Sequence, residues 1–200
     1  MALILIIRRL YSEPAFTYLR TQKQLGYIVS FGTNTYGRYI HVIFCFPSSS
    51  ELLLFFCVVH HRGRNGIKGL ELRVLSKQHS PLSIHKHCVD FLLQHKSAHI
   101  DTLESASLVL MTNNIIKSLV DPLNSVFEEG SVYWQEILYD LDYYGFQVDE
   151  VVAALKEVSV SEVQAACQGW LYGASGNNGG AKRLSVLIFG NKHKEEFQLQ

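Results

Sequence analysis

Histidine is the residue type in this chain that could do chemistry most directly. The chain contains nine histidines. His95 and His99 are four residues apart, and Cys88 lies one heptad earlier, so a helix would carry all three on one face. Such a set could hold a metal ion. However, no carboxylate lies between the two histidines, and neither H-x-x-E-H nor H-E-x-x-H occurs anywhere. We therefore expect packed or solvated histidines, no metal site and no catalytic residue within this chain.

Arg20 and Tyr27 form a second pair of interest. Gly26 offers a turn between them, so a helix, a turn and a strand would place both at one edge of the domain. Arginine carries a planar fork of N–H donors, and tyrosine carries one O–H donor. By spacing alone, such residues are more often a surface ion-pair partner and a residue at the rim of a core.

The elements around these residues follow from apolar periodicity and capping patterns. Ser12-Glu13-Pro14 indicates the start of a helix, with Pro14 in the first turn and with Phe16 and Leu19 facing the core. Strands are predicted over 27–31, within 66–76 and over 184–189, and helices over 82–96, 101–121, 125–141 and 159–171. Asp101 with Glu104, and Ser159 with Glu162, have the spacing of capping boxes. This order of elements predicts an α+β fold in which helices pack on a sheet.

The segment from Tyr39 to Val59 departs from this pattern. It has two eight-residue apolar runs, 39–46 and 52–59, and Glu51 is its one formal charge. It would make a poor membrane helix, because a central acidic residue costs about 2.5–3.5 kcal/mol on insertion scales. Without residues 38–62, the strands on either side would connect through a short turn. We therefore interpret 38–62 as a dispensable insertion. A translated intron is the favoured origin, and a lineage-specific loop or hairpin is the alternative.

The segment from Ser12 to Val29 carries the most specific pattern in the chain. It resembles the E-P-x-F-x-x-L-R-T-x-x-Q-L-G-Y signature of the closing, C-terminal domain in the family of insulin-degrading enzyme, nardilysin and pitrilysin, which are zinc metalloendopeptidases. The matching positions are Glu13, Pro14, Phe16, Leu19, Arg20, Thr21, Gln24, Leu25, Gly26 and Tyr27. Weaker likenesses follow in order at Tyr133–Ile137 and at Leu184–Gly190. Outside the insertion, the resemblance covers about Leu10 to Asn191.

This resemblance implies a single partial domain over residues 1–200, with helices packed on one face of a mostly antiparallel sheet. In that family, zinc is bound in the first domain by an H-x-x-E-H motif, and the last domain closes over the chamber from the opposite half. The resemblance implies that Arg20 and Tyr27 support substrate binding and the transition state of peptide hydrolysis in the intact enzyme. The expected partners are peptides and the zinc-bearing half. The chain alone has no zinc motif, and we expect it to be inactive.

Composition narrows the alternatives further. With 18 basic and 18 acidic residues the net charge is zero, which argues against a nucleic-acid binder and gives no reason for a membrane-surface role. The apolar run before Arg8 and Arg9 is too short for a secretory signal. The four cysteines have no CxxC spacing, which is typical of free thiols in a reducing, cytoplasmic protein. A stand-alone module that binds peptides or a subunit without catalysis, or a non-functional product of a misread gene, remains open.

Overall fold

The computed structural model describes residues 1–36, 51–57, 67–139, 147–173, 183–190, 193 and 195. The helices are α1 (Ala2–Ala15), α2 (Pro81–His95), α3 (Ser105–Val120), α4 (Val126–Tyr139), α5 (Gln147–Glu157) and α6 (Val160–Cys167). Short π-helical segments extend three of them: η1 (Phe16–Gln22), η2 (Lys96–Ile100) and η3 (Gln168–Tyr172). The strands are β1 (Ile28–Tyr36), β2 (Glu51–Cys57), β3 (Ile67–Ser76) and β4 (Arg183–Ile188).

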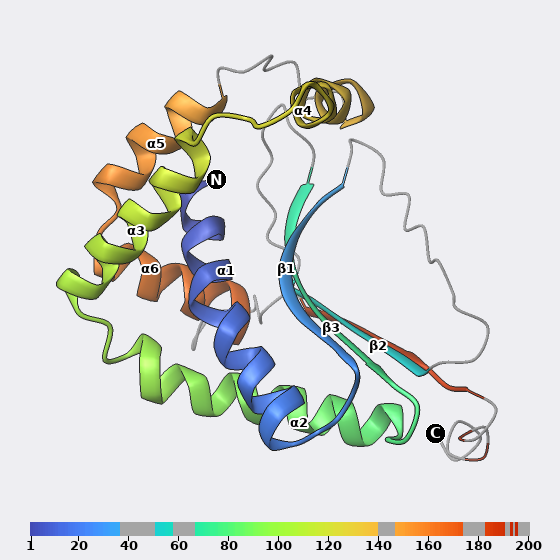
Figure 1. The fold of residues 1–200 in the computed structure, drawn as a ribbon. Coiled ribbons are helices and arrows are strands. Elements are labelled where there is room, and N and C mark those ends of the chain that lie inside the picture. Colours follow the sequence, from blue (N-terminus) through green and yellow to red (C-terminus); the bar gives the residue numbers. More distant parts are fainter. Residues whose placement is uncertain are drawn as a thin grey trace.

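The four strands form one sheet in the order β1-β3-β2-β4 (Figure 1). Every neighbouring pair is antiparallel, with Ile28 opposite Leu75, Leu52 opposite Leu75 on the other side, and Leu52 opposite Ile188. Helix α1 lies against β1 and β3, and α3, α5 and α6 contact α1. The predicted α+β fold, with helices packed on an antiparallel sheet, is confirmed.

Strand β2 comes from the segment that composition marks as an insertion. The predicted insertion spans 38–62, and of that range only Glu51–Cys57 is among the described residues. This strand lies between β3 and β4 and pairs with both. If residues 38–62 were removed, the expected short turn would join β1 to β3. Strand β4 would then lose β2, the strand with which it pairs. The intron origin of 38–62 stays a prediction, and an interior strand position is what an apolar run of this length suits.

The first helix begins earlier than predicted. Ser12–Pro14 does not start it: α1 begins at Ala2, and Pro14 lies inside the helix near its end. Pro14 was therefore misassigned to a first turn. The apolar run from Ala2 to Ile7 already supplies a helical face, and Ile4, Ile6 and Ile7 are all buried. After Pro14 the backbone widens into the π-helix η1.

Later elements largely follow their sequence patterns. The predicted stripe of α2, from Ile84 to Leu92, is buried, and Ser159 with Glu162 makes the complete capping box at α6. The capping box at Asp101 is wrong, because Glu104 is the N-cap residue of α3 and lacks a side-chain cap. Asp101 instead pairs with Lys96 at 3.9 Å. Helix α5 was not predicted as a separate element.

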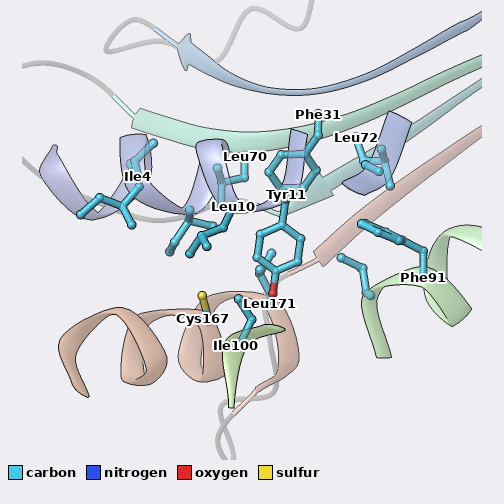
Figure 2. Close-up of a cluster of buried hydrophobic side chains, with 14 of the residues drawn as sticks. Ile4, Leu10, Tyr11, Phe31, Leu70, Leu72, Phe91, Ile100, Cys167 and Leu171 are labelled. Carbon is cyan, nitrogen blue, oxygen red and sulfur yellow. The ribbon is translucent and has the colours of Figure 1, made fainter. Parts of the chain in front are cut away.

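The core centres on Tyr11 of α1 (Figure 2). Its ring stacks on Phe31 of β1, with centroids 5.2 Å apart, and meets the edge of Phe91 at 6.3 Å. Its hydroxyl lies 2.7 Å from the Tyr172 hydroxyl, which donates to the Leu92 carbonyl at 2.8 Å. Because the single Tyr172 proton is used in that bond, Tyr11 donates to Tyr172. Burial, and then the nearby Cys167, raise the pKa of Tyr11, so its hydroxyl stays protonated.

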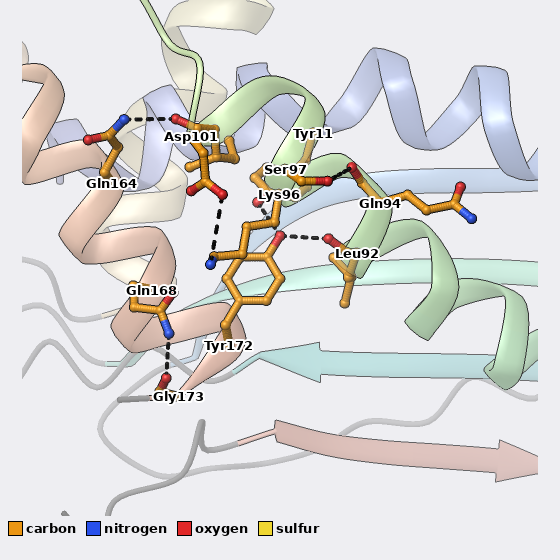
Figure 3. A network of polar contacts seen from close by, with 11 residues as sticks. Tyr11, Leu92, Gln94, Lys96, Ser97, Asp101, Gln164, Gln168, Tyr172 and Gly173 are labelled. Carbon is orange, nitrogen blue, oxygen red and sulfur yellow. Dashed lines mark hydrogen bonds and ion pairs between the residues drawn. The ribbon is translucent and has the colours of Figure 1, made fainter. Parts of the chain in front are cut away.

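Polar contacts close the junction of α2 and η2 with α6 and η3 (Figure 3). Gln164 donates to the Ile100 carbonyl at 2.9 Å, and Tyr172 donates to the Leu92 carbonyl at 2.8 Å. Within this junction, Gln168 donates to the Gly173 carbonyl at the end of η3, at 2.7 Å. Helix α4 is different, since its described apolar side chains are largely exposed, with Val126 at 86% and Phe127 at 83%.

Within the described part of the chain, no helix has both the length and the apolar character needed to cross a membrane.

Candidate functional site

Arg20 and Tyr27 lie together at one edge of the domain, as the sequence predicts. Arg20 is on the last turn of η1, and Tyr27 directly precedes β1. The guanidinium of Arg20 donates from one terminal nitrogen to the backbone carbonyl of Tyr27, and it also lies 5.3 Å from the ring centroid of Phe16. Phe16 is therefore exposed instead of facing the core. It supports the arginine through a cation–π contact.

The turn between the two residues explains the sequence that separates them. Gln24 has a positive φ of 53°, and Leu25 is buried and donates its N–H to the Leu19 carbonyl at 3.0 Å. At Gly26 the backbone passes so close to β3 that an added Cβ would lie 2.3 Å from the Leu75 carbonyl oxygen. Only glycine fits there without a shift of the backbone.

Tyr27 is fixed by its backbone and presents its ring to solvent. Its N–H donates to the Leu75 carbonyl at 3.1 Å, and its side chain is 43% exposed. The ammonium of Lys77 lies 5.6 Å from the ring centroid. The edge thus gathers two cations, Arg20 and Lys77, around one tyrosine.

This arrangement suits the stabilisation of negative charge. Arginine has five N–H donors, so the bond to the Tyr27 carbonyl orients the guanidinium and leaves further donors for an anion. Donors that are fixed before charge develops cost no reorganisation when it appears. The edge therefore has donors suited to an oxyanion or a carboxylate.

The expectation that Cys88, His95 and His99 hold no metal ion stays a prediction. The rings of His95 and His99 have centroids 4.6 Å apart and are tilted by 32°. Burial raises the pKa of the Cys88 thiol to about 12, which disfavours the thiolate that a metal requires. Among the described residues, no group of three or more possible metal-ligating side chains occurs.

Sequence reasoning missed one contact at this region. The ring of His95 interacts with the Leu10 backbone, which raises its pKa, and its Nε2 is buried without a hydrogen-bond partner. Burial, and then the proximity of His99, lower the pKa of His95 to about 4. Pro14 could have indicated this contact. Proline has no N–H, so the carbonyl of Leu10, four residues earlier, has no helical donor.

Comparisons with known proteins bear on the fold. Neither models of protein families nor the sequences of curated proteins give a match. Among solved structures, the chain is similar to the crystal structure of pitrilysin, with a TM-score of 0.66 and 14% sequence identity. The likeness covers 97% of this chain and 17% of the pitrilysin chain, so the chain spans less than a fifth of that protein. It establishes a distant pitrilysin-like fold.

Proposed function

We propose that this chain is a non-catalytic closing domain of a pitrilysin-type zinc metalloendopeptidase, supplying substrate-binding and transition-state contacts to peptide hydrolysis. The observation that carries the proposal is the joined pair Arg20 and Tyr27, held at one edge of a pitrilysin-like fold. Peptides and the zinc-bearing half of the enzyme are the proposed partners.

The division of work follows from the chemistry of the two halves. Zinc, bound by the other half, would polarise the scissile carbonyl and activate water. The Arg20 guanidinium, anchored on the Tyr27 carbonyl, would donate to the oxygen on which negative charge develops. The Tyr27 hydroxyl would add a single donor beside it. Neither residue needs to bind metal or transfer a proton for this role.

The exposed surface of α4 supports action within a larger assembly. Val126 and Phe127 are exposed together with Trp134 and Ile137, and apolar surface of this kind usually marks an interface. The described cysteines Cys88 and Cys167 are buried and form no disulfide, which supports a reducing compartment. We therefore propose the cytoplasm as the place of action.

The test has two arms. The purified chain alone should contain no stoichiometric zinc and should not cleave a fluorogenic peptide. Mixed with a separately produced zinc-bearing half of a pitrilysin-type enzyme, it should associate and raise peptide hydrolysis, and Arg20→Ala should associate equally but raise it less. One tightly bound zinc per chain with chelator-sensitive cleavage would overturn the proposal. Peptide binding by the chain without any association would instead favour the stand-alone binding module.

A further inference from the structure

A pocket of about 460 Å³ lies on the helical side of the domain, away from β1. One wall comes from the end of α1 and from η1, and the other comes from the end of α2 and from η2. Its volume is within the range of about 300–1,000 Å³ that is usual for ligand pockets. Arg20 and Tyr27 do not line it, so it is separate from the edge described above.

Four aromatic rings line this pocket as one continuous series. Tyr18 and Phe91 have centroids 5.7 Å apart, Phe91 and His95 are 5.4 Å apart, and His95 and His99 are 4.6 Å apart. The tilts between successive rings are 34°, 27° and 32°. Phe91 lies between Tyr18 and His95 in this series, so Tyr18, the terminal ring, is the one that can offer a face. The face of a tyrosine ring carries negative electrostatic potential and attracts cations.

The polar groups of the pocket favour the same kind of ligand. Glu13 is the one Asp, Glu, Lys or Arg among its lining residues. His95 is neutral, because burial holds its pKa near 4. Its Nε2 is a buried atom, so it does not face a ligand in the pocket. Gln22 and Gln94 add carboxamide oxygens. The pocket thus combines one negative charge with two carboxamide acceptors.

A cation from the chain itself already contacts this wall. The ammonium of Lys23 lies 5.4 Å from the centroid of the Tyr18 ring. Tyr18 is therefore placed so that a positive group can reach its face.

We propose that this pocket binds the basic side chain of a peptide, with a guanidinium lying against the ring of Tyr18 and paired with the Glu13 carboxylate. A guanidinium is preferred because it is planar, stacks on aromatic faces and donates in several directions to acceptors such as Gln22 and Gln94. The proposal requires no zinc-bearing partner, so it stands or falls separately from the proposed function.

The experiment measures binding of two small probes to the full chain by calorimetry at mildly alkaline pH. The probes are N-acetyl-arginine amide and N-acetyl-citrulline amide, which have nearly the same shape and differ in charge. The arginine probe should bind saturably, and the citrulline probe should bind about tenfold more weakly, since it loses both the ion pair and the cation–π contact. Added salt should lower the affinity for the arginine probe and leave the affinity for the citrulline probe unchanged.

Variants make the result specific to the pocket. Glu13→Gln should lower the affinity for the arginine probe about fivefold, the upper value for an exposed ion pair. The affinity for the citrulline probe should stay unchanged. Glu104→Gln, an exposed carboxylate at the start of α3, is the matched control and should change neither. Tyr18→Leu should also weaken the arginine probe, with folding checked by a thermal melt. Equal affinity for the two probes, no saturable binding, or an unchanged affinity in Glu13→Gln would each overturn the proposal.

Discussion

The ring of His95, at the end of α2, interacts with the backbone of Leu10 in α1, and this contact opposes the lowering of the pKa of His95 by burial. Pro14 lies four residues after Leu10 and has no N–H, so it cannot give the Leu10 carbonyl the bond a helix normally provides. Leu10 is buried, and a buried carbonyl without a donor is destabilising. The contact with His95 therefore lies where Pro14 removes a helical hydrogen bond, and it joins two helices that are far apart in the sequence.

The burial of His95, which lowers its pKa, predicts a particular loss of stability in acid. The folded pKa of His95 is about 4, below the value of about 6.5 for an unfolded histidine. The unfolded chain therefore binds the extra proton first, and the free energy of unfolding should fall as pH falls from about 6.5 to about 4. In His95→Phe, which has no proton to bind, this part of the pH dependence should disappear. Urea unfolding at a series of pH values measures it.

The control for this prediction is His99→Gln. The charge of His99 helps to lower the pKa of His95. Removing His99 should therefore raise that pKa and shorten the pH range over which the free energy of unfolding falls, without abolishing the fall. An identical pH dependence in wild type and His95→Phe would show that another group is responsible.

Gly26 and Gly32 offer a matched pair for testing the turn before β1. A Cβ at Gly26 would lie 2.3 Å from the Leu75 carbonyl oxygen, whereas a Cβ at Gly32 would meet nothing within 4 Å. Gly26→Ala should therefore lower the free energy of unfolding by about 1–3 kcal/mol, as overpacking does. Gly32→Ala should be neutral or stabilising, by up to about 1 kcal/mol. Equal effects of the two substitutions in urea unfolding would refute this account of the turn.

The position of β2 leads to a prediction about the proposed insertion. Composition alone predicts that deletion of 38–62 raises stability. The deletion also removes β2, which pairs with both β3 and β4, so we expect the amides of β4 to lose protection from hydrogen exchange. The amides of β1 pair with β3 and serve as the internal control. A higher melting temperature with β4 still protected would support the insertion and contradict the pairing described here.

Sequence reasoning succeeded where a structural feature is set by residues close together in the sequence. The stripe through Ile84 and Cys88 and the capping box at Ser159 are set by residues within one or two turns, and both were predicted correctly. Pro14 was misassigned because His95, which contacts the backbone at Leu10, is distant in the sequence. The signature gave Arg20 and Tyr27, but the need for glycine at position 26 comes from Leu75 on another strand. Pairings between distant segments leave no periodicity to detect.

The final prediction concerns Arg20 and Tyr27 in the intact enzyme. Tyr27→Phe keeps the ring and the backbone carbonyl that anchors Arg20, so it isolates the hydroxyl. Arg20→Ala removes the guanidinium and one exposed hydrogen bond, worth on the order of 1 kcal/mol of stability. Each substitution should lower kcat/KM for a short peptide, by roughly 10²–10³ if the group is a transition-state donor. A thermal melt of each variant should change little.

Two further variants separate transition-state support from a structural role. Arg20→Lys should restore activity only in part, because a point charge cannot donate to the Tyr27 carbonyl and to an oxyanion in the same planar arrangement. The double variant Arg20→Ala with Tyr27→Phe should lose less activity than the product of the single losses, since both groups would act on one developing charge. Wild-type kinetics in a single variant would remove that residue from the site. If the melting temperature fell in step with kcat/KM, the pair would instead be holding the turn at Gly26, and its effect on hydrolysis would be indirect.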